Sequence, residues 1–227
     1  MVLESGLDTP GSTFSSLLPG IEDITRVCWY DRAGVGKSQK LPASAPDPSP
    51  GRASEALKEV LSEEGIAPPY VVVGWSYGGM VAQVFATEYP ELVAGIVLED
   101  SSVREQFVNP WFGQNGWVEA GRVVDETAVL AELAHVDFGD VPMALVTAGQ
   151  HGEDKIARLW VRFQRRLAAL SSNAVHVEAL HAGHAIHIDA SDLEVALITE
   201  VVEAARTGTH MAPCDGRFAA LEGRCFA

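Results

Sequence analysis

The chain has 227 residues, of which 47% are hydrophobic, so it is long and apolar enough to bury the core of one domain. Its formal net charge of −15 argues against nucleic acid or an anionic membrane surface as a partner. No apolar run approaches the roughly 20 residues that a membrane helix needs, and residues 1–6 lack the basic and apolar regions of a signal peptide. We therefore expect no membrane partner and favour a cytoplasmic location.

The first elements of the chain are short. Val2 and Leu3 predict an apolar strand that ends in a loop with glycine and proline, residues 5–11. Residues 13–18 predict a short helix, and residues 26–30 (Arg-Val-Cys-Trp-Tyr) predict a second buried strand.

Gly-Lys-Ser at residues 36–38 matches the end of a phosphate-binding loop motif. That motif also requires a glycine five residues before Gly36, and the chain has Asp31 there. A helix should begin at the lysine, but prolines between residues 42 and 50 prevent it. The sequence therefore excludes a phosphate-binding loop.

The next part of the chain alternates helices with apolar strands. Residues 41–51 predict a proline-rich surface loop, and Ser54 opens a helix with Leu57, Val60 and Leu61 on one face. The elements that follow are a strand over residues 70–74, a buried helix over 78–89 and a strand over 91–98.

Residues 103–140 interrupt this alternation, and we expect them to form a small cap inserted into a domain that spans residues 1–206. They mix aromatic side chains with glycines, and a helical segment runs from about Glu126 to His135. The remaining predicted elements are a strand over 141–147, an amphipathic helix over 153–170, a strand over 174–180, a last helix opened by a capping box at Ser191 and Glu194 and ending near 206, and a tail over 207–227.

Strands that alternate with helices predict an α/β fold with a parallel sheet covered on both faces. The functional groups of such a sheet gather at the carboxyl ends of its strands. Ser76, Asp100 and His184 each follow a predicted strand. We therefore expect these three side chains at one edge of the sheet.

Ser76 lies in the motif G-x-S-x-G at residues 74–78, between an apolar strand and an apolar helix. A side chain at Gly74 or Gly78 would collide with the strand or the helix in a tight turn. The turn aims the serine and the free N–H groups of the helix start at one point, where a developing oxyanion would lie. The pattern therefore predicts a nucleophilic serine rather than a structural glycine turn.

The chain resembles bacterial esterase-like members of the α/β-hydrolase fold with a small cap. The likeness runs from residue 2 to about residue 206 and rests on residues 30–38, 74–79, 89–90, 98–101 and 182–184, with Ser, Asp and His in the order of that fold. It implies a mostly parallel sheet of about six strands with helices on both faces. The usual N-terminal hairpin is lacking, because the chain starts at what is the third strand of its relatives, and Ser5-Gly6 stands where they often have His-Gly.

The resemblance implies a serine hydrolase that cleaves carboxylic esters through an acyl-enzyme, without a metal or an organic cofactor. Ser76 is then the nucleophile, and His184 is the base that later protonates the leaving group. The backbone N–H groups of Tyr77 and Leu7 would form the oxyanion hole. An amidase or aminopeptidase, a perhydrolase, and a catalytically silent ligand-binding protein of the same fold are the alternatives.

Three carboxylates compete for the third catalytic role. Glu153 and Asp154 follow the strand over residues 141–147, which is the common location in the fold, but Gly152 stands nearer to the position that many relatives use. Acids in the first turn of a helix also stabilise its dipole without catalysis. Asp100 follows its strand directly and lacks that competing explanation, so we favour Asp100 over the other two.

Aromatic residues near the expected site are candidates for a pocket that binds a small-molecule ester, although those of residues 103–140 equally suit the core of a cap. The pocket candidates are Trp75, Phe107, Trp111, Phe112 and Trp117. We interpret His181 and His187 as hydrogen-bonding or exposed residues rather than catalytic ones.

The missing hairpin should leave the strand over residues 26–30 at or near a sheet edge, where exposed apolar residues tend to pair. We expect a homodimer through this edge, or its cover by the tail. The three cysteines have no zinc-site spacing. Cys214 and Cys225 could close a disulfide in the tail, which would help only in an oxidising compartment.

Overall fold

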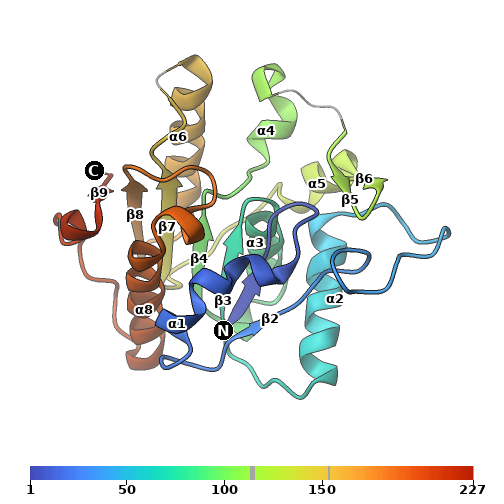
Figure 1. Ribbon diagram of the computed structural model, residues 1–227, viewed down its shortest axis with the longest axis horizontal. Coiled ribbons are helices and arrows are strands. Elements are labelled where there is room, and N and C mark those ends of the chain that lie inside the picture. The colour runs from blue at the N-terminus through green and yellow to red at the C-terminus, as the bar shows by residue number, and fades with distance from the viewer. Residues whose placement is uncertain (113–115, 153, 227) are drawn as a thin grey trace.

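The computed structural model describes residues 1–112, 116–152 and 154–226, and its centre is a seven-stranded sheet (Figure 1). In order across the sheet, the strands are β2 (Cys28–Trp29), β1 (Val2–Glu4), β3 (Tyr70–Trp75), β4 (Val93–Glu99), β7 (Met143–Ala148), β8 (Ala174–Ala179) and β9 (Gly223–Cys225). Neighbouring strands are parallel except β8 and β9, which are antiparallel. The predicted α/β fold with a mostly parallel sheet is confirmed, and β9 is the strand that the sequence did not predict.

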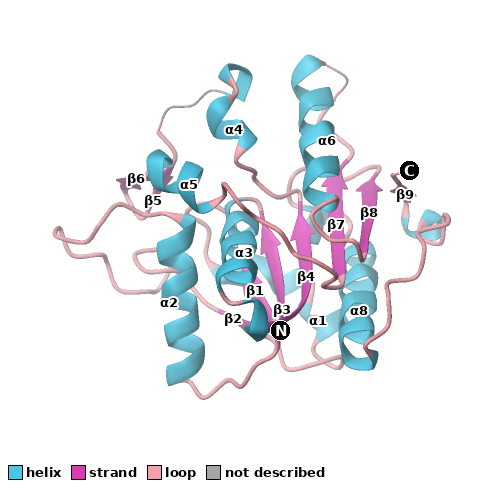
Figure 2. Ribbon diagram, turned by 180° about the vertical axis from the view of Figure 1, so that it is seen from behind, coloured by secondary structure: helices cyan, strands magenta, loops and turns pink. Residues whose placement is uncertain are grey.

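Helices cover both faces of this sheet, as the two opposite views show (Figures 1 and 2). On one face lie α1 (Leu18–Ile21), α7 (Ile186–Asp189) and α8 (Ser191–Thr207), and on the other lie α2 (Pro50–Glu63), α3 (Tyr77–Glu88) and α6 (Lys155–Ala168). Short 3-10 helices are η1 (Gly11–Ser16), η2 (Pro90–Leu92), η3 (Pro110–Phe112) and η4 (Ala219–Leu221). Within the described part of the chain, no helix has the length and apolar character needed to cross a membrane.

The central strands divide their side chains between two cores. Val71 and Val73 of β3 pack in the core beneath α8, whereas Val72 between them packs in the core beneath α3 and α6. This alternation is the period of two that a strand imposes, and burial on both faces explains why the strand sequence is apolar without interruption. The two cores hold the carboxyl ends of β3 and β4 in fixed positions for the site.

The two edges of the sheet are built differently from one another. The edge strand β2 is shorter than the predicted strand over residues 26–30, and its Trp29 is 44% exposed. The described part of the tail, residues 207–226, does not cover this edge, so the expected cover by the tail is wrong, whereas a homodimer through this edge stays a prediction. Instead β9 pairs with β8 at the opposite edge, and a disulfide joins Cys214 to Cys225 there. Phe218, buried in the main core, anchors the tail.

Residues 103–140 contain α4 (Glu105–Val108), α5 (Glu126–Glu132) and a small antiparallel hairpin of β5 (Val118–Glu119) and β6 (Arg122–Val123). In Figure 1, α4 lies above the carboxyl end of the sheet, and α5 and the hairpin lie to one side, above α2. The helix of this segment ends at Glu132 rather than near His135. That the segment functions as a cap over the site stays a prediction.

One predicted helix start and one predicted helix cap are wrong. α2 begins at Pro50, because Ser49 accepts a hydrogen bond from the Arg52 backbone and caps the helix four residues earlier than expected. The capping box at the start of α8 does not form. Ser191 is already helical there, and Glu194 turns inward to a fully buried position.

Candidate active site

Ser76 lies at the turn between β3 and α3, and its backbone has φ 54° and ψ −119°. Such a conformation is uncommon for a residue with a side chain, so the surrounding structure has to enforce it. A Cβ on Gly74 would lie 2.6 Å from the Gly78 carbonyl oxygen, and a Cβ on Gly78 would lie 2.1 Å from the Glu4 carbonyl oxygen. Both glycines are therefore required by close backbone approach, as the G-x-S-x-G motif predicts.

Asp100 follows β4, the strand beside β3, and is fully buried. Its Oδ1 accepts hydrogen bonds from the Ala148 backbone N–H at 3.1 Å and from Trp160 Nε1 at 2.7 Å. Its Oδ2 lies 2.7 Å from His184 Nδ1 and 2.8 Å from His151 Nε2. Burial acts to raise the pKa of Asp100, but the hydrogen bonds from the two histidines outweigh burial and leave the pKa below its usual value. Asp100 is therefore an ionised carboxylate with both oxygens satisfied.

His184 is held on two sides. Its Nδ1 faces Asp100, and its backbone carbonyl accepts a hydrogen bond from Trp75 Nε1 at 2.7 Å. The side chain is 45% exposed, which leaves the imidazole accessible to a substrate. Among the described residues, the hydroxyl of Ser76 makes no hydrogen bond, so the structure joins Asp100 to His184 and not His184 to the serine. Such contacts are often long in an empty site and tighten when substrate binds.

His151 and Trp160 are contacts of the acid that the sequence analysis missed. His151 follows β7 by three residues, and this position after a strand was its only available signal. Trp160 lies on the apolar face of α6, where the pattern predicts core packing and gives no hint of a hydrogen bond to Asp100. Both contacts join segments more than 50 residues apart, so only the folded chain brings them together.

Hydrogen bonds from the buried Arg32 fix the loop that carries Leu7. Arg32 Nη1 donates to the Ser5 carbonyl oxygen at 2.7 Å and its Nη2 to the Gly6 carbonyl oxygen at 2.6 Å. Arg32 also pairs with Glu4 and, at 2.6 Å, with Glu119 of β5. Burial opposes the charge of Arg32, but these two carboxylates outweigh it and raise the pKa.

The same network reaches the backbone beside Leu7. Glu119 accepts a hydrogen bond from the Asp8 backbone N–H at 2.5 Å, and Asp8 in turn accepts one from the Ala120 backbone at 2.9 Å. Tyr77 is the first residue of α3, where backbone N–H groups have no partner within the helix. The two predicted oxyanion donors thus lie on neighbouring segments, since Gly78 of α3 packs directly on Glu4 and Ser5.

The structure places only one of the five aromatic candidates in a cavity next to His184. This cavity, of about 220 Å³, is lined by Phe112, His151, Trp160 and His184 among others. Trp75 instead packs against His184, with the two ring centroids 5.4 Å apart. The other three candidates lie elsewhere: Phe107 and Trp117 pack in the core around Tyr77, and Trp111 is an exposed ring beneath Lys155.

Of the two alternative acids, Asp154 makes no hydrogen bond or ion pair with His184 in the described structure. Asp154 is the N-cap of α6 and accepts a hydrogen bond from the Ala157 backbone at 2.8 Å. This is the structural role that the sequence analysis considered for it. Glu153 lies outside the described residues.

One group of potential metal ligands occurs among the described residues: Glu99, His187 and Glu194, all fully buried. Glu99 precedes Asp100 but faces the α8 side of the sheet, whereas Asp100 faces α6. His187, which we interpreted as a hydrogen-bonding or exposed residue, is buried and hydrogen-bonded, and His181 is exposed. The described residues around Ser76 and His184 include no such ligand group.

Comparison with known proteins places the chain in a family. The sequence profile of the α/β-hydrolase fold family matches residues 2–126. An uncharacterized protein of Bacillus subtilis, YqjL, is 25% identical over 199 residues, which cover 83% of this chain and 78% of that protein. A pimeloyl-[acyl-carrier protein] methyl ester esterase of Photobacterium profundum is 31% identical over 113 residues, or 50% of this chain and 41% of that protein.

Solved structures show the same fold. A thermophilic esterase from Thermogutta terrifontis superposes with a TM-score of 0.66 at 17% identity, covering 90% of this chain and 89% of that one. Since the family profile matches more than half of the sequence, the chain belongs to the α/β-hydrolase fold family, and this membership supports hydrolase activity.

Proposed function

We propose that the protein is a serine hydrolase that cleaves carboxylic esters, with Ser76 as nucleophile, His184 as base and Asp100 as the acid that orients His184. The observation that carries this proposal is the contact of His184 Nδ1 with the ionised Asp100, beside a serine held in a strained turn. A carboxylate at Nδ1 fixes the tautomer that leaves Nε2 free to accept a proton from a hydroxyl.

The proposed reaction has two halves. Ser76 Oγ attacks the ester carbonyl carbon while His184 Nε2 takes the hydroxyl proton, and the backbone N–H groups of Tyr77 and Leu7 stabilise the oxyanion. His184 then gives its proton to the departing alcohol and leaves an acyl-serine. Water attacks the acyl-serine with His184 again as base, and the carboxylic acid departs as the serine regains its proton.

The size of the cavities supports a substrate with a small to medium acyl group. The cavity beside His184 has a volume of about 220 Å³, and a second of about 180 Å³ lies between Tyr77, Arg32 and the loop around Pro46. Both are below the roughly 300–1,000 Å³ typical of pockets for drug-sized ligands. The methyl ester esterase among the relatives also favours an ester with a small leaving group.

A panel of nitrophenyl esters of increasing acyl length, with a matching anilide as the amide control, tests this proposal. We expect hydrolysis that is fastest for short and medium acyl chains, and a Ser76→Ala variant that folds normally but loses at least about 10⁴-fold in kcat. Comparable rates on ester and anilide would favour an amidase. A folded wild-type protein without activity on any ester would favour the silent ligand-binding alternative.

A further inference from the structure

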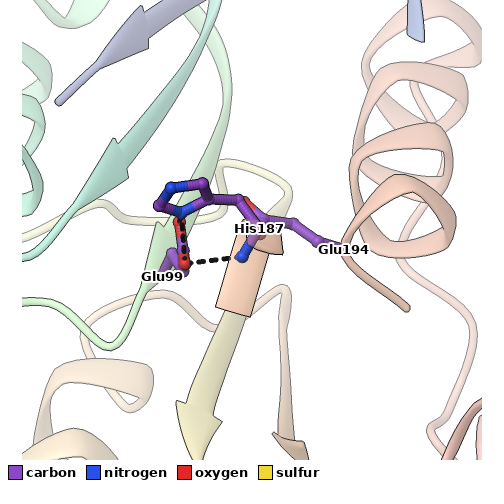
Figure 3. Close-up of side chains that lie close together, drawn as sticks. All are labelled: Glu99, His187 and Glu194. Atoms are coloured by element: carbon purple, nitrogen blue, oxygen red, sulfur yellow. Dashed lines mark hydrogen bonds and ion pairs between the residues drawn. The ribbon is translucent and has the colours of Figure 1, made fainter. Parts of the chain in front are cut away.

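A second pairing of an acid with a histidine lies directly behind the first. Glu99 and Asp100 are consecutive at the end of β4, and His184 and His187 are three residues apart, His184 just before α7 and His187 within it. His187 Nδ1 lies 2.8 Å from Glu99 Oε1, and the His187 backbone N–H donates to the same oxygen at 2.8 Å (Figure 3). The two consecutive acids therefore hold two histidines of one segment.

Glu194 points from α8 toward this pair (Figure 3). As an ionised carboxylate, it would have no hydrogen-bond partner for either oxygen among the described residues, although both oxygens are fully buried. Its carboxylate lies within 4.8 Å of the ligand atoms of Glu99 and His187. A buried charge without a partner is strongly unfavourable, so this arrangement needs a positive charge or a proton.

A proton on Glu194 removes the unpaired charge from the cluster and supplies a hydrogen-bond donor. Burial raises the pKa of both Glu99 and Glu194 well above the usual carboxyl value, and the charge of Glu99 raises that of Glu194 further. A protonated Glu194 can donate its hydrogen bond to Glu99, which then accepts from Glu194 and from the backbone and side chain of His187. Like charges in close proximity favour such sharing of one proton.

His187 is neutral in this arrangement, because burial lowers its pKa. Its Nδ1–H donates to Glu99, and its Nε2, 3.0 Å from Thr13 Oγ1, accepts the hydrogen of that hydroxyl. The other charged groups that act on the cluster are Asp100, beside Glu99, and Asp189, near His187. The charge of Asp100 raises the pKa of Glu99, whereas Asp189 favours the charged form of His187 without outweighing burial.

The cluster is connected to His184 through its backbone and through Trp75. All four polar groups of His187 are engaged, since Ser16 Oγ also donates to its carbonyl oxygen at 2.5 Å. The His187 ring packs edge-on against Trp75, with centroids 4.8 Å apart, and Trp75 Nε1 holds the His184 carbonyl. A displaced His187 would therefore shift both supports of His184.

We propose that Glu194 carries a proton at neutral pH and that the buried chain Glu194–Glu99–His187 positions His184 against Asp100. The protonation of Glu194 stands by itself, whereas the positioning of His184 rests on the proposed function. A divalent cation is the competing explanation, but among the described residues the cluster offers three ligand side chains, and a single proton is enough to remove the unpaired charge.

The protonation is tested by Glu194→Gln, an isosteric neutral variant whose amide can donate to Glu99 as the acid does. A raised pKa in the folded state means that the folded protein binds more protons than the unfolded one above about pH 4.5, so wild-type stability falls as pH rises. We expect Glu194→Gln to raise the thermal midpoint by about 3 °C or more near pH 8 and by less than about 1 °C near pH 4.5. Glu203→Gln, at an exposed site on the same helix, should show no such trend.

The positioning is tested by two variants of His187 on the best nitrophenyl ester. His187→Asn keeps an N–H donor near the place of Nδ1, whereas His187→Leu removes it. We expect kcat to fall about tenfold or more in the folded His187→Leu protein at a nearly unchanged KM, and the asparagine variant to recover most of this loss. Equal kcat values for wild type and both variants would overturn the positioning role.

Two results would overturn the protonation. One is a Glu194→Gln protein that is less stable than wild type at both pH values. The other is a stoichiometric divalent metal in the purified wild-type protein that is absent from Glu194→Gln. Because these readouts are stability and metal content, a protein that hydrolyses no ester would refute the proposed function and still leave the protonation testable.

Discussion

Asp100 and Glu99 are neighbours in the chain and equally buried, yet their pKa values shift in opposite directions. Asp100 faces α6 and receives four hydrogen bonds, from two histidines, a tryptophan and a backbone N–H. Glu99 faces α8, where a second carboxylate, Glu194, lies close by. Burial alone therefore does not decide the charge of an acid; the donors and charges around it do.

The two acids at the end of β4 therefore have different roles. At Asp100, hydrogen-bond donors of the protein replace the water that would otherwise solvate a carboxylate. Asp100 therefore keeps a fixed negative charge beside His184. On the other face, Glu99 and Glu194 share one proton, so that the pair supports His187 with one negative charge instead of two.

Replacing Asp100 with asparagine should have the largest effect in this comparison. Asp100→Asn removes the charge that stabilises the imidazolium of His184 and allows the wrong tautomer, so kcat should fall by up to about 10⁴-fold in a folded protein. The measurement is steady-state hydrolysis of the best nitrophenyl ester. Asp154→Asn is the matched control, since Asp154 only caps α6, and its activity should change no more than a few-fold. The reverse ranking of these two variants would refute Asp100 as the acid.

Removing one of the hydrogen-bond donors that contact Asp100 should have an intermediate effect on kcat. Trp160→Phe keeps the ring but deletes the Nε1–H that reaches Oδ1, which leaves a buried carboxylate oxygen with one donor fewer. We expect kcat to fall about tenfold, a loss on the scale of one buried hydrogen bond. Trp111→Phe, at an exposed ring, should leave kcat unchanged. Identical kcat values for both variants would show that the donors do not maintain the charge of Asp100.

The smallest expected effect, and the most diagnostic, is the way in which the thermal stability of two variants changes with pH relative to the wild type. The lowered pKa of Asp100 means that its contribution is present above its unfolded pKa of about 3.9 and is lost as pH falls. The loss of thermal stability in Asp100→Asn should therefore shrink from about pH 7 to about pH 3. The gain in Glu194→Gln should instead grow as pH rises. If the change in thermal stability had the same pH dependence in both variants, it would contradict an ionised Asp100 on one face of the sheet and a protonated Glu194 on the other.

Much of this arrangement could be predicted from local patterns. Strand and helix periodicity predicted six strands along the chain, and the glycines around Ser76 predicted the tight turn, because both are determined by neighbouring residues. The strand-end positions of Asp100 and His184 also predicted that they meet, since a parallel sheet brings such ends together. The structure joins them, and their catalytic roles remain a proposal.

Other features depend on contacts between segments that are distant in the sequence, so no local sequence pattern predicts them. His151 and Trp160 reach Asp100 from loops and helices more than 50 residues away. The strand β9 has three residues and no apolar alternation, so only its pairing with β8 defines it. The inward turn of Glu194 contradicted a capping pattern that fits the sequence, because its buried partners Glu99 and His187 belong to other elements.

The central claim is that Ser76 is a nucleophile activated by the Asp100–His184 pair. Labelling with a fluorophosphonate probe, followed by mass spectrometry of the modified peptide, tests it most directly because it requires no knowledge of the natural substrate. We predict a stoichiometric adduct on Ser76 of the wild-type protein, no adduct in Ser76→Ala, and much slower labelling in Asp100→Asn. A folded wild-type protein that remains unlabelled, or that carries the adduct on another residue, would contradict the claim.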